Sequence, residues 1–262
     1  MDIRRFYVSE DDITDNVVTI CGDEFWHLTK VLRYKVGYKI IVCNNVDGKD
    51  YLCKINFIDK DYCQAIIEDV FDNECKTKVE VSLFQALPKG DKADLILQKA
   101  VELGVKNIFF FSSEFVAEKK FNVDRLNKIN IEACKQCGRS RISDVHGLLT
   151  FEQMLELLKN YDKVIICYEN EKLNGIKSEL STFAGQSIAV IIGSEGGFSQ
   201  AEVDKCVSCG ANSVTLGKRI MRCETASIVV CGIVMYELGE MNWWKLWFII
   251  LVARLINMKA TE

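Results

Sequence analysis

The sequence predicts an α/β protein in two parts: a small, mainly antiparallel β-barrel over residues 1–72, and a parallel sheet with helices over residues 73–240. Short apolar runs follow one another closely in the first part, whereas strand-like and helix-like segments alternate in the second. With 262 residues and 49% hydrophobic composition, the chain is long enough to bury a core in each part.

The first part contains several runs typical of strands and one segment typical of a helix. The helix is expected at residues 24–32, and the strands are expected at residues 3–8, 17–21, 38–43, 51–57 and 63–70. Residues 71–78 are polar and charged, which predicts a linker between the two parts.

The second part begins with a predicted βαβ unit. An apolar strand at residues 79–86 leads through the turn Pro88-Lys89-Gly90 into a helix that Asp91 caps and Gly104 closes. Because such crossovers are right-handed and join parallel strands, this unit predicts a parallel sheet. The further expected elements are strands at residues 108–111 and 164–168, a helix at residues 124–137, and a helix opened by the capping box Thr150-x-x-Gln153.

A first glycine loop follows the apolar, β-branched run at residues 188–193, which predicts a strand buried on both faces. Gly193, Gly196 and Gly197 allow the backbone to turn sharply and to approach a ligand closely. Ser199-x-x-Glu202 then forms a predicted capping box at the start of a helix. We therefore expect this loop to present backbone amides to a ligand.

A second glycine loop repeats the arrangement after a predicted strand at residues 213–217. It carries the cations Lys218, Arg219 and Arg222, and Thr225 is expected to open the next helix. That helix is apolar on nearly every side until its last turn, which indicates burial inside the domain or against a second subunit.

Charge is unevenly distributed along the chain. The formal net charge of −4 by itself argues against a nucleic-acid partner, but residues 116–141 hold seven lysines or arginines against three acids, a net of +4. Together with the cations of the second glycine loop, they predict a basic face for phosphates. A solvated helix face is the alternative explanation.

Twelve cysteines without a recognisable signal peptide are typical of a protein in a reducing cytoplasm. Cys134 and Cys137, like Cys206 and Cys209, have the Cys-x-x-Cys spacing of zinc sites. Both pairs fall in predicted helices rather than on tight turns, so buried thiols are favoured over zinc and no metal is expected. The two histidines are too far apart in sequence to indicate a metal site.

Motifs in a fixed order carry a resemblance to a known family. They are HLTKVLRYKVG at residues 27–37, ALPKGDKADLILQKAVELGV at 86–105, EACKQCGRSRI at 132–142, IGSEGGF at 192–198 and LGKRIMRCETA at 216–226. Over about residues 1–240, the chain resembles the bacterial ribosomal RNA methyltransferases of the RsmE family, which belong to the SPOUT class.

The resemblance implies a transferase that uses S-adenosyl-L-methionine to methylate N3 of a specific uridine in 16S rRNA of the small ribosomal subunit, an RNA modification of ribosome biogenesis. It implies a PUA-like RNA-binding barrel followed by a SPOUT-type domain with a C-terminal trefoil knot. Periodicity does not reveal a knot, because chains almost never thread loops. The resemblance also implies a homodimer with the cofactor in the knot, near the subunit boundary. The apolar helix from Thr225 is then expected in the knot or at the interface.

Two features depart from the family pattern. Ser194 stands where the family more often has proline, which is expected to loosen the first glycine loop without removing a ligand group. The apolar tail at residues 241–262 has no recognised counterpart, and its longest uninterrupted apolar run, at residues 246–253, is too short to span a bilayer. Packing of the tail on the dimer is favoured over a place at a membrane surface or an aberrant extension.

The cofactor is expected between the two glycine loops, where the resemblance implies that backbone groups of the second loop recognise the adenine. The residues expected to bind the cofactor are Ile192, Gly193, Glu195, Gly196, Gly197, Leu216, Gly217, Ile220, Met221, Arg222, Thr225 and Ala226.

Methylation of uridine N3 requires that the N3 proton leaves or that the resulting anion is stabilised. We expect Arg219 and Arg222 to hold the RNA phosphate and the developing oxyanion, and Glu195 or Glu224 to be the base. The alternative role of Arg222 is a salt bridge with Glu224, and that of Glu195 is to order the loop through backbone amides.

RNA contacts are expected from cations in both parts of the chain. The candidates are Arg4, Arg5, Arg33, Lys89, Lys92, Arg139 and Arg141. Two other functions remain open. A Rossmann-like nucleotide-binding enzyme would need a G-x-G-x-x-G spacing that is missing, and a non-catalytic RNA-binding module of the same fold would not need the intact loops.

Overall fold

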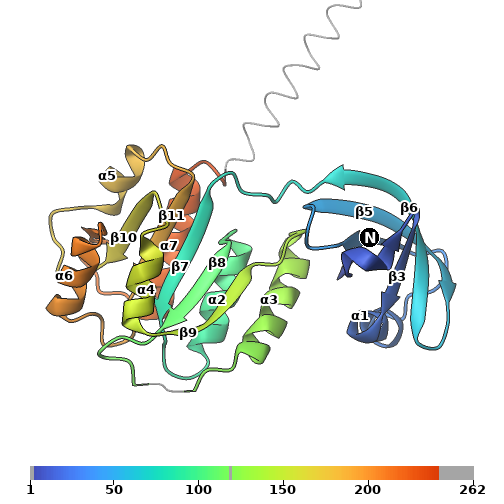
Figure 1. Cartoon of the computed structure of the whole chain (residues 1–262), viewed down its shortest axis with the longest axis horizontal. Coiled ribbons are helices and arrows are strands. Elements are labelled where there is room, and N and C mark those ends of the chain that lie inside the picture. The colour runs from blue at the N-terminus through green and yellow to red at the C-terminus, as the bar shows by residue number, and fades with distance from the viewer. Residues whose placement is uncertain (1–2, 118–119, 242–262) are drawn as a thin grey trace, which may run out of the picture. The chain divides into compact units, whose positions relative to one another are not determined.

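The computed structural model describes residues 3–117 and 120–241, so the predicted tail beyond Met241 lies outside the described residues. The chain divides into two compact units (Figure 1). The barrel unit contains the residues up to Lys76 together with Asn122–Val145, and the sheet unit contains Thr77–Phe121 and the residues from His146 onward.

The barrel unit is built on one strongly curved sheet, with the strand order β1-β4-β5-β6-β3-β2. Its strands are β1 (Arg5–Tyr7), β2 (Ile13–Thr14), β3 (Val17–Cys21), β4 (Lys39–Cys43), β5 (Lys49–Ile58) and β6 (Tyr62–Asp72). The pair β1 and β4 is parallel, and the other paired strands are antiparallel. This confirms the mainly antiparallel first part. Side chains such as Phe6, Ile20 and Ile55 fill its core.

The predicted helix at residues 24–32 is confirmed in position, but only its first part is α-helical. It consists of α1 (Gly22–Trp26) and a π-helical turn, η2 (His27–Val31), after a short 3-10 turn, η1 (Glu10–Asp12). The hydroxyl of Thr29 donates to the carbonyl of Phe25 at 2.8 Å and competes there with the regular backbone hydrogen bond. Arg33, in the left-handed region at φ 56°, ends the segment.

Helix α3 (Val123–Cys137) groups in space with the barrel, although sequence order places it in the second part. The amide of Asn73 donates to Oδ2 of Asp50 and to the carbonyl of Gly138, each at 2.9 Å. Strand β6 continues to Asp72, so the prediction that the linker begins at residue 71 is wrong.

The sheet unit has the strand order β12-β10-β11-β7-β8-β9. Its strands are β7 (Glu80–Ala86), β8 (Asn107–Phe111), β9 (Asp144–Leu149), β10 (Lys163–Cys167), β11 (Ser187–Ile192) and β12 (Asn212–Val214). Strands β7, β8, β10, β11 and β12 are joined by parallel pairings, which confirms the predicted parallel sheet. Its helices are α2 (Lys92–Glu102), α4 (Phe151–Leu158), α5 (Ile176–Ser181), α6 (Gln200–Ser208) and α7 (Cys223–Glu237).

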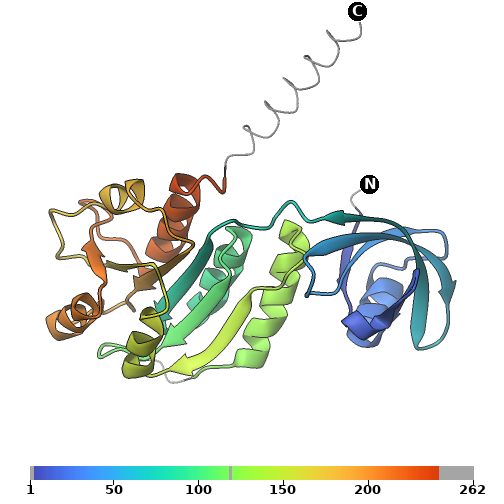
Figure 2. The same cartoon turned by 45° about the horizontal axis from the view of Figure 1, so that its top comes forward.

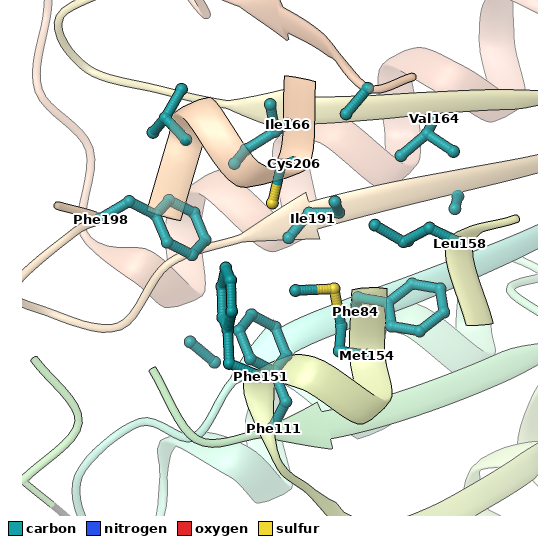
Figure 3. Close-up of a cluster of buried hydrophobic side chains, with 14 of the residues drawn as sticks. Phe84, Phe111, Phe151, Met154, Leu158, Val164, Ile166, Ile191, Phe198 and Cys206 are labelled. Atoms are coloured by element: carbon teal, nitrogen blue, oxygen red, sulfur yellow. The ribbon is translucent and has the colours of Figure 1, made fainter. Parts of the chain in front are cut away.

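Helices cover both faces of this sheet (Figures 1 and 2). On one face, side chains of α4 and α6 pack on β10, β11 and β7; Figure 3 shows Met154 and Cys206 against Ile191 and Phe84. On the other, α7 packs on β7, β11, α2 and α5. Both predicted capping boxes form: the side chains of Thr150 and Ser199 accept from the amides of Gln153 and Glu202.

Helix α7 is buried on one side only. Val230, Cys231, Val234 and Met235 are buried in the sheet unit, whereas Tyr236 is exposed. The helix begins at Cys223 with Arg222 as its N-cap, so the prediction that Thr225 opens it is wrong. The trefoil knot that the resemblance implies stays a prediction.

Candidate active site

A cavity of about 1010 Å³ lies in the sheet unit, between segments that follow three neighbouring strands. Three segments line the cavity: residues 167–172 at the end of β10, residues 192–198 at the end of β11, and residues 215–223 after β12. In open α/β sheets, ligands bind outside the carboxyl ends of the strands. The cavity therefore joins both glycine loops at the edge of the sheet where a ligand site is expected.

The glycines of the first loop serve packing within the protein. A Cβ on Gly196 would lie 2.6 Å from Cβ of Phe115, and one on Gly197 would collide with the carboxylate of Glu169. A Cβ on Gly193 would lie 3.1 Å from the backbone of Gly197. The expectation that these glycines make room for a ligand is thus incomplete, because the protein's own atoms occupy the space beside them.

Ser194 also belongs to this packing. It is 6% exposed, and its hydroxyl donates to the carbonyl of Phe115 at 3.4 Å. The serine at this position therefore ties the loop to the chain around Phe115.

The second loop is the open wall of the cavity. Gly217 has φ +108° and has no atom within 4 Å of the position that a Cβ would take, so its glycine is required by the backbone conformation. Ile220 is 90% exposed, which is unusual for an apolar side chain in a cavity lining. Lys218, Arg219 and Arg222 are exposed in the same loop. This wall offers apolar surface and positive charge to a ligand.

Most of the residues expected to bind the cofactor line this cavity. These are Ile192, Gly193, Glu195, Gly196, Gly197, Leu216, Gly217, Ile220, Met221, Arg222 and Ala226. Thr225, which is exposed in the first turn of α7, is not among the lining residues.

The segment after β10 was missed by the sequence analysis. Tyr168, Glu169 and Lys172 line the cavity, and the hydroxyl of Tyr168 accepts from Asn170 at 2.9 Å. No glycine marks this segment. The available signal was its place directly after a buried parallel strand that neighbours β11.

Lys92 joins the carboxylates of both loops. Its ammonium lies 2.6 Å from Oε1 of Glu195 and 3.9 Å from Oε2 of Glu224. The backbone amide of Lys89 also donates to Oε1 of Glu195, at 3.1 Å. Lys92 thus has carboxylate partners within the protein, and its expected role as an RNA contact stays a prediction.

These contacts hold both carboxylates in the charged form. Burial raises the pKa of Glu195, but the hydrogen bonds from Lys92 and from the backbone outweigh it, so the pKa lies below the ordinary 4.5. For Glu224, burial is likewise outweighed by hydrogen bonds from the backbone and from Cys223 and by the charge of Lys92, so its pKa is also lowered. Burial raises the pKa of Cys223 to about 12.

Arg5 has a structural role in the barrel unit. Its guanidinium forms a two-pronged ion pair with Asp50, and the two side chains are 11% and 6% exposed. Burial raises the pKa of Asp50, but hydrogen bonds from Arg5 and Asn73 outweigh it, so the pKa is lowered. Arg5 is therefore committed to Asp50, which argues against its expected role as an RNA contact.

The other expected RNA contacts are more accessible. Arg4, Arg33, Lys89 and Arg141 are exposed, and Arg139 is half-buried. The guanidinium of Arg141 donates to the carbonyl of Val46 and so has a partner in the barrel unit.

The side chains of Cys134, Cys206 and His146 pack within the protein. Cys134 and Cys206 are fully buried, and His146 stacks on Phe109 with the ring centroids 4.0 Å apart. Among residues 3–117 and 120–241, no group of His, Cys, Asp and Glu has the geometry of a metal site. In the same ranges no helix is long and apolar enough to cross a bilayer.

Comparison with known proteins identifies the family. An RNA methyltransferase domain matches residues 75–235, and an RNA methyltransferase PUA domain matches residues 20–68. The ribosomal RNA small subunit methyltransferase E of Buchnera aphidicola subsp. Acyrthosiphon pisum is 32% identical over 245 residues, or 91% of this chain and 95% of the relative. The chain belongs to the ribosomal RNA small subunit methyltransferase E family. The Bacillus subtilis family member is 29% identical over 230 residues, or 84% of this chain and 90% of its own.

Two solved structures share the fold of this chain. The methyltransferase E of Neisseria gonorrhoeae, bound to S-adenosyl methionine, has a TM-score of 0.78 at 27% identity and covers 90% of this chain and 98% of that chain. The crystal structure of a hypothetical protein has a TM-score of 0.82 at 26% identity and covers 91% and 100%. The SPOUT-type fold with a PUA-like first part is therefore confirmed.

Proposed function

We propose that this protein transfers a methyl group from S-adenosylmethionine to N3 of a uridine in 16S rRNA of the small ribosomal subunit. The observation that carries the proposal is the cavity between the two glycine loops, in a chain that belongs to the ribosomal RNA small subunit methyltransferase E family. The family member from Neisseria gonorrhoeae was solved with S-adenosyl methionine bound, which supports the choice of cofactor.

The residues of the cavity fit this cofactor. The volume of about 1010 Å³ lies at the upper end of the usual range for small-molecule sites. Open backbone at Gly217 and the exposed side chain of Ile220 suit the flat faces of an adenine. The carboxylate of Glu169, which lines the cavity beside Gly197, suits hydrogen-bond donors such as ribose hydroxyls.

When bound, the cofactor supplies an electrophilic methyl group on a sulfonium. The protein's part is to stabilise the uracil anion that forms when the N3 proton leaves. Arg219 and Arg222 are exposed cations at the cavity, and we assign Arg222 to the developing oxyanion and Arg219 to the RNA phosphate. Guanidinium groups suit both tasks because they stay charged and donate several hydrogen bonds in a plane.

Glu195 and Glu224 are weak candidates for the general base. Both have lowered pKa values, and Glu195 is already engaged by Lys92 and Lys89. A good base has a pKa near the working pH, so these carboxylates would accept the N3 proton poorly. We therefore propose that Glu195 and Glu224 hold the first glycine loop and the start of α7, and that the N3 proton leaves to solvent while the arginines stabilise the anion that forms.

RNA binding is proposed for Arg4, Arg33, Lys89, Arg139 and Arg141. Each phosphate that a cation neutralises releases counterions, so affinity should fall steeply as salt rises. If several of these cations contact phosphates, the affinity for small subunits should weaken by about a factor of ten or more between 50 and 200 mM salt. A flat salt profile would remove this part of the proposal.

A homodimer in the cytoplasm, with the trefoil knot, completes the proposal. Ile228, Val229 and Ile233 of α7 are only half-buried by the chain itself, which suits cover by a second subunit. Light scattering coupled to gel filtration would measure the mass in solution, and a monomer at micromolar concentration would argue against the dimer.

Thermal shifts with three ligands separate the alternative functions. S-adenosylmethionine should raise the melting temperature, because a ligand that binds the native state stabilises it. NAD and GTP should not bind and should leave the melting temperature unchanged. Stabilisation by NAD or GTP instead would favour a Rossmann-like enzyme. Binding of S-adenosylmethionine with no methyl transfer to small subunits would favour a non-catalytic RNA-binding module.

A further inference from the structure

Gln85 is a fully buried polar side chain beneath the cavity, on strand β7. Its amide nitrogen donates to the carbonyl of Gly193 at 3.1 Å and to the carbonyl of Ala86 at 2.8 Å. Its amide oxygen accepts from the hydroxyl of Ser227, which is 1% exposed. One side chain therefore contacts the first glycine loop and the first turns of α7.

The chemistry of the neighbours fixes the orientation of this amide. The carbonyls of Gly193 and Ala86 only accept hydrogen bonds, so the NH₂ group must face them. The oxygen is then left for the Ser227 hydroxyl, which also lies 2.8 Å from the carbonyl of Cys223. Both amide protons of Gln85 are satisfied, and its oxygen shares the single Ser227 hydroxyl proton with the carbonyl of Cys223.

A polar residue is not what packing alone would select here. The flanking Phe84 and Ala86 are 0% exposed, and the strand is buried along almost its whole length. An apolar side chain would avoid the desolvation of an amide, which stabilises a core only when every partner is in place. The amide is therefore best explained by what it holds.

Gln85 links two segments that line the cavity, the first glycine loop and the start of α7. Gly193 lines the cavity in the first loop, and Ala226, next to Ser227, lines it from α7. The other link between these walls, Lys92 with Glu195 and Glu224, is partly exposed. Of these two links between described residues, that of Gln85 is the one shielded from water, so it should be the stiffer.

We propose that Gln85 is a positioning residue for the methyl transfer, because it joins Gly193 to Ser227 and so sets the width of the cavity between the two glycine loops. This inference rests on the proposed function. Gln85 itself lies outside the cavity lining and acts through the residues that it holds.

Asn107 offers a matched control on the adjacent strand. It is 8% exposed on β8, and its amide donates to Ser82 at 2.9 Å and to Glu80 at 2.8 Å, at the other end of β7. Gln85→Leu and Asn107→Leu each delete a buried amide from the same sheet.

The measurements are the melting temperature, the Kd for S-adenosylmethionine by calorimetry, and kcat and KM for methyl transfer to small subunits.

Both variants should melt at lower temperature, because each leaves buried partners unsatisfied. Gln85→Leu should also raise the Kd for S-adenosylmethionine about tenfold and lower kcat, whereas Asn107→Leu should leave both within about twofold. Ser227→Ala, a milder change, should raise the Kd in the wild-type background and add little in the Gln85→Leu background.

The results that would overturn the inference are distinct from those that would overturn the function. A Gln85→Leu protein with wild-type Kd and kcat, or an Asn107→Leu protein impaired as much, would give Gln85 an ordinary structural role. If Gln85→Leu does not fold, Ser227→Ala decides, and wild-type binding and turnover in that variant would reject the inference. A wild-type protein that neither binds the cofactor nor methylates RNA would instead reject the proposed function.

Discussion

The ammonium of Lys92 lies 2.6 Å from Oε1 of Glu195 in the first glycine loop and 3.9 Å from Oε2 of Glu224 at the start of α7. One cation on α2 thus holds the carboxylates of two segments that are far apart in sequence. The hydrogen bond from Lys92 helps to keep Glu195 charged, whereas backbone and Cys223 hydrogen bonds do more for Glu224. Lys218, Arg219 and Arg222 are the cations of the second loop that line the cavity.

Replacing Lys92 with methionine should weaken cofactor binding severalfold, because the first glycine loop loses the contact that orders Glu195. Stability should fall by about 0.2–1 kcal/mol at neutral pH, the range for partly exposed ion pairs. Lys99→Met is the control, since Lys99 pairs with Glu102 at 2.8 Å on the same helix but does not line the cavity. Equal cofactor affinity in the two variants would contradict the role given to Lys92.

The stability difference between wild type and Lys92→Met should depend on pH. The folded-state pKa of Glu195 lies below its ordinary 4.5, so the pair stabilises the fold above that pH and its contribution is lost as pH falls through the lower folded value. Urea unfolding of both proteins at pH 7 and in acid measures this. A difference in unfolding free energy between the two proteins that became larger in acid would contradict this stabilising role of the Lys92–Glu195 pair.

Gly197→Ala should destabilise the protein more than Gly210→Ala. Both residues have positive φ, at +68° and +95°, but a Cβ on Gly210 meets nothing within 4 Å while one on Gly197 meets the Glu169 carboxylate. Gly210→Ala measures the backbone strain alone, about 1–2 kcal/mol. The excess at Gly197, about 1–3 kcal/mol, should be reduced by a second change, Glu169→Ala. Equal losses in denaturant unfolding would disprove the contact.

Arg222→Ala should lower kcat for methyl transfer by about 10²–10³-fold, the usual loss when a group that stabilises an oxyanion is removed. The Kd for S-adenosylmethionine should change much less, because the charge acts on the RNA base. Lys177→Ala removes an exposed cation of α5 outside the cavity and should leave kcat unchanged. Single-turnover kinetics with small subunits measures the step, and a wild-type rate for Arg222→Ala would reject the assignment.

Arg5→Met should destabilise the barrel unit by about 3–5 kcal/mol, because it leaves the buried carboxylate of Asp50 without its positively charged partner. The neighbouring exposed Arg4 provides the comparison: Arg4→Met should change stability by no more than about 0.5 kcal/mol. Chemical denaturation gives both values. A mild effect of Arg5→Met would restore this arginine as a candidate for RNA contact.

Local patterns in the sequence were sufficient for most of the fold. The β-branched run before Gly193 predicts β11, and Ser199 with Glu202 predicts the start of α6, because both signals depend on residues that are neighbours in the chain. The π-helical turn at His27–Val31 was not predicted, since it depends on one competing hydroxyl, that of Thr29.

Long-range contacts explain what the sequence analysis missed at the site. The roles of Gly196 and Gly197 depend on Phe115 and Glu169, which come from distant segments, and the role of Arg5 depends on Asp50. Helix α3 joins the barrel unit through contacts with residues such as Asn73, which its own apolar pattern does not reveal. Residue type and spacing predict which groups line a cavity better than they predict what each group touches.

The direct test of the central claim is methyl transfer by the purified protein. Small ribosomal subunits that lack the modification would be incubated with radiolabelled S-adenosylmethionine, and the labelled nucleoside would be identified by mass spectrometry and mapped on 16S rRNA. We predict 3-methyluridine at a single position, formed about 10²–10³-fold more slowly by Arg222→Ala. Absence of methyl transfer by the wild-type protein, or a methyl group on another atom, would contradict the proposed function.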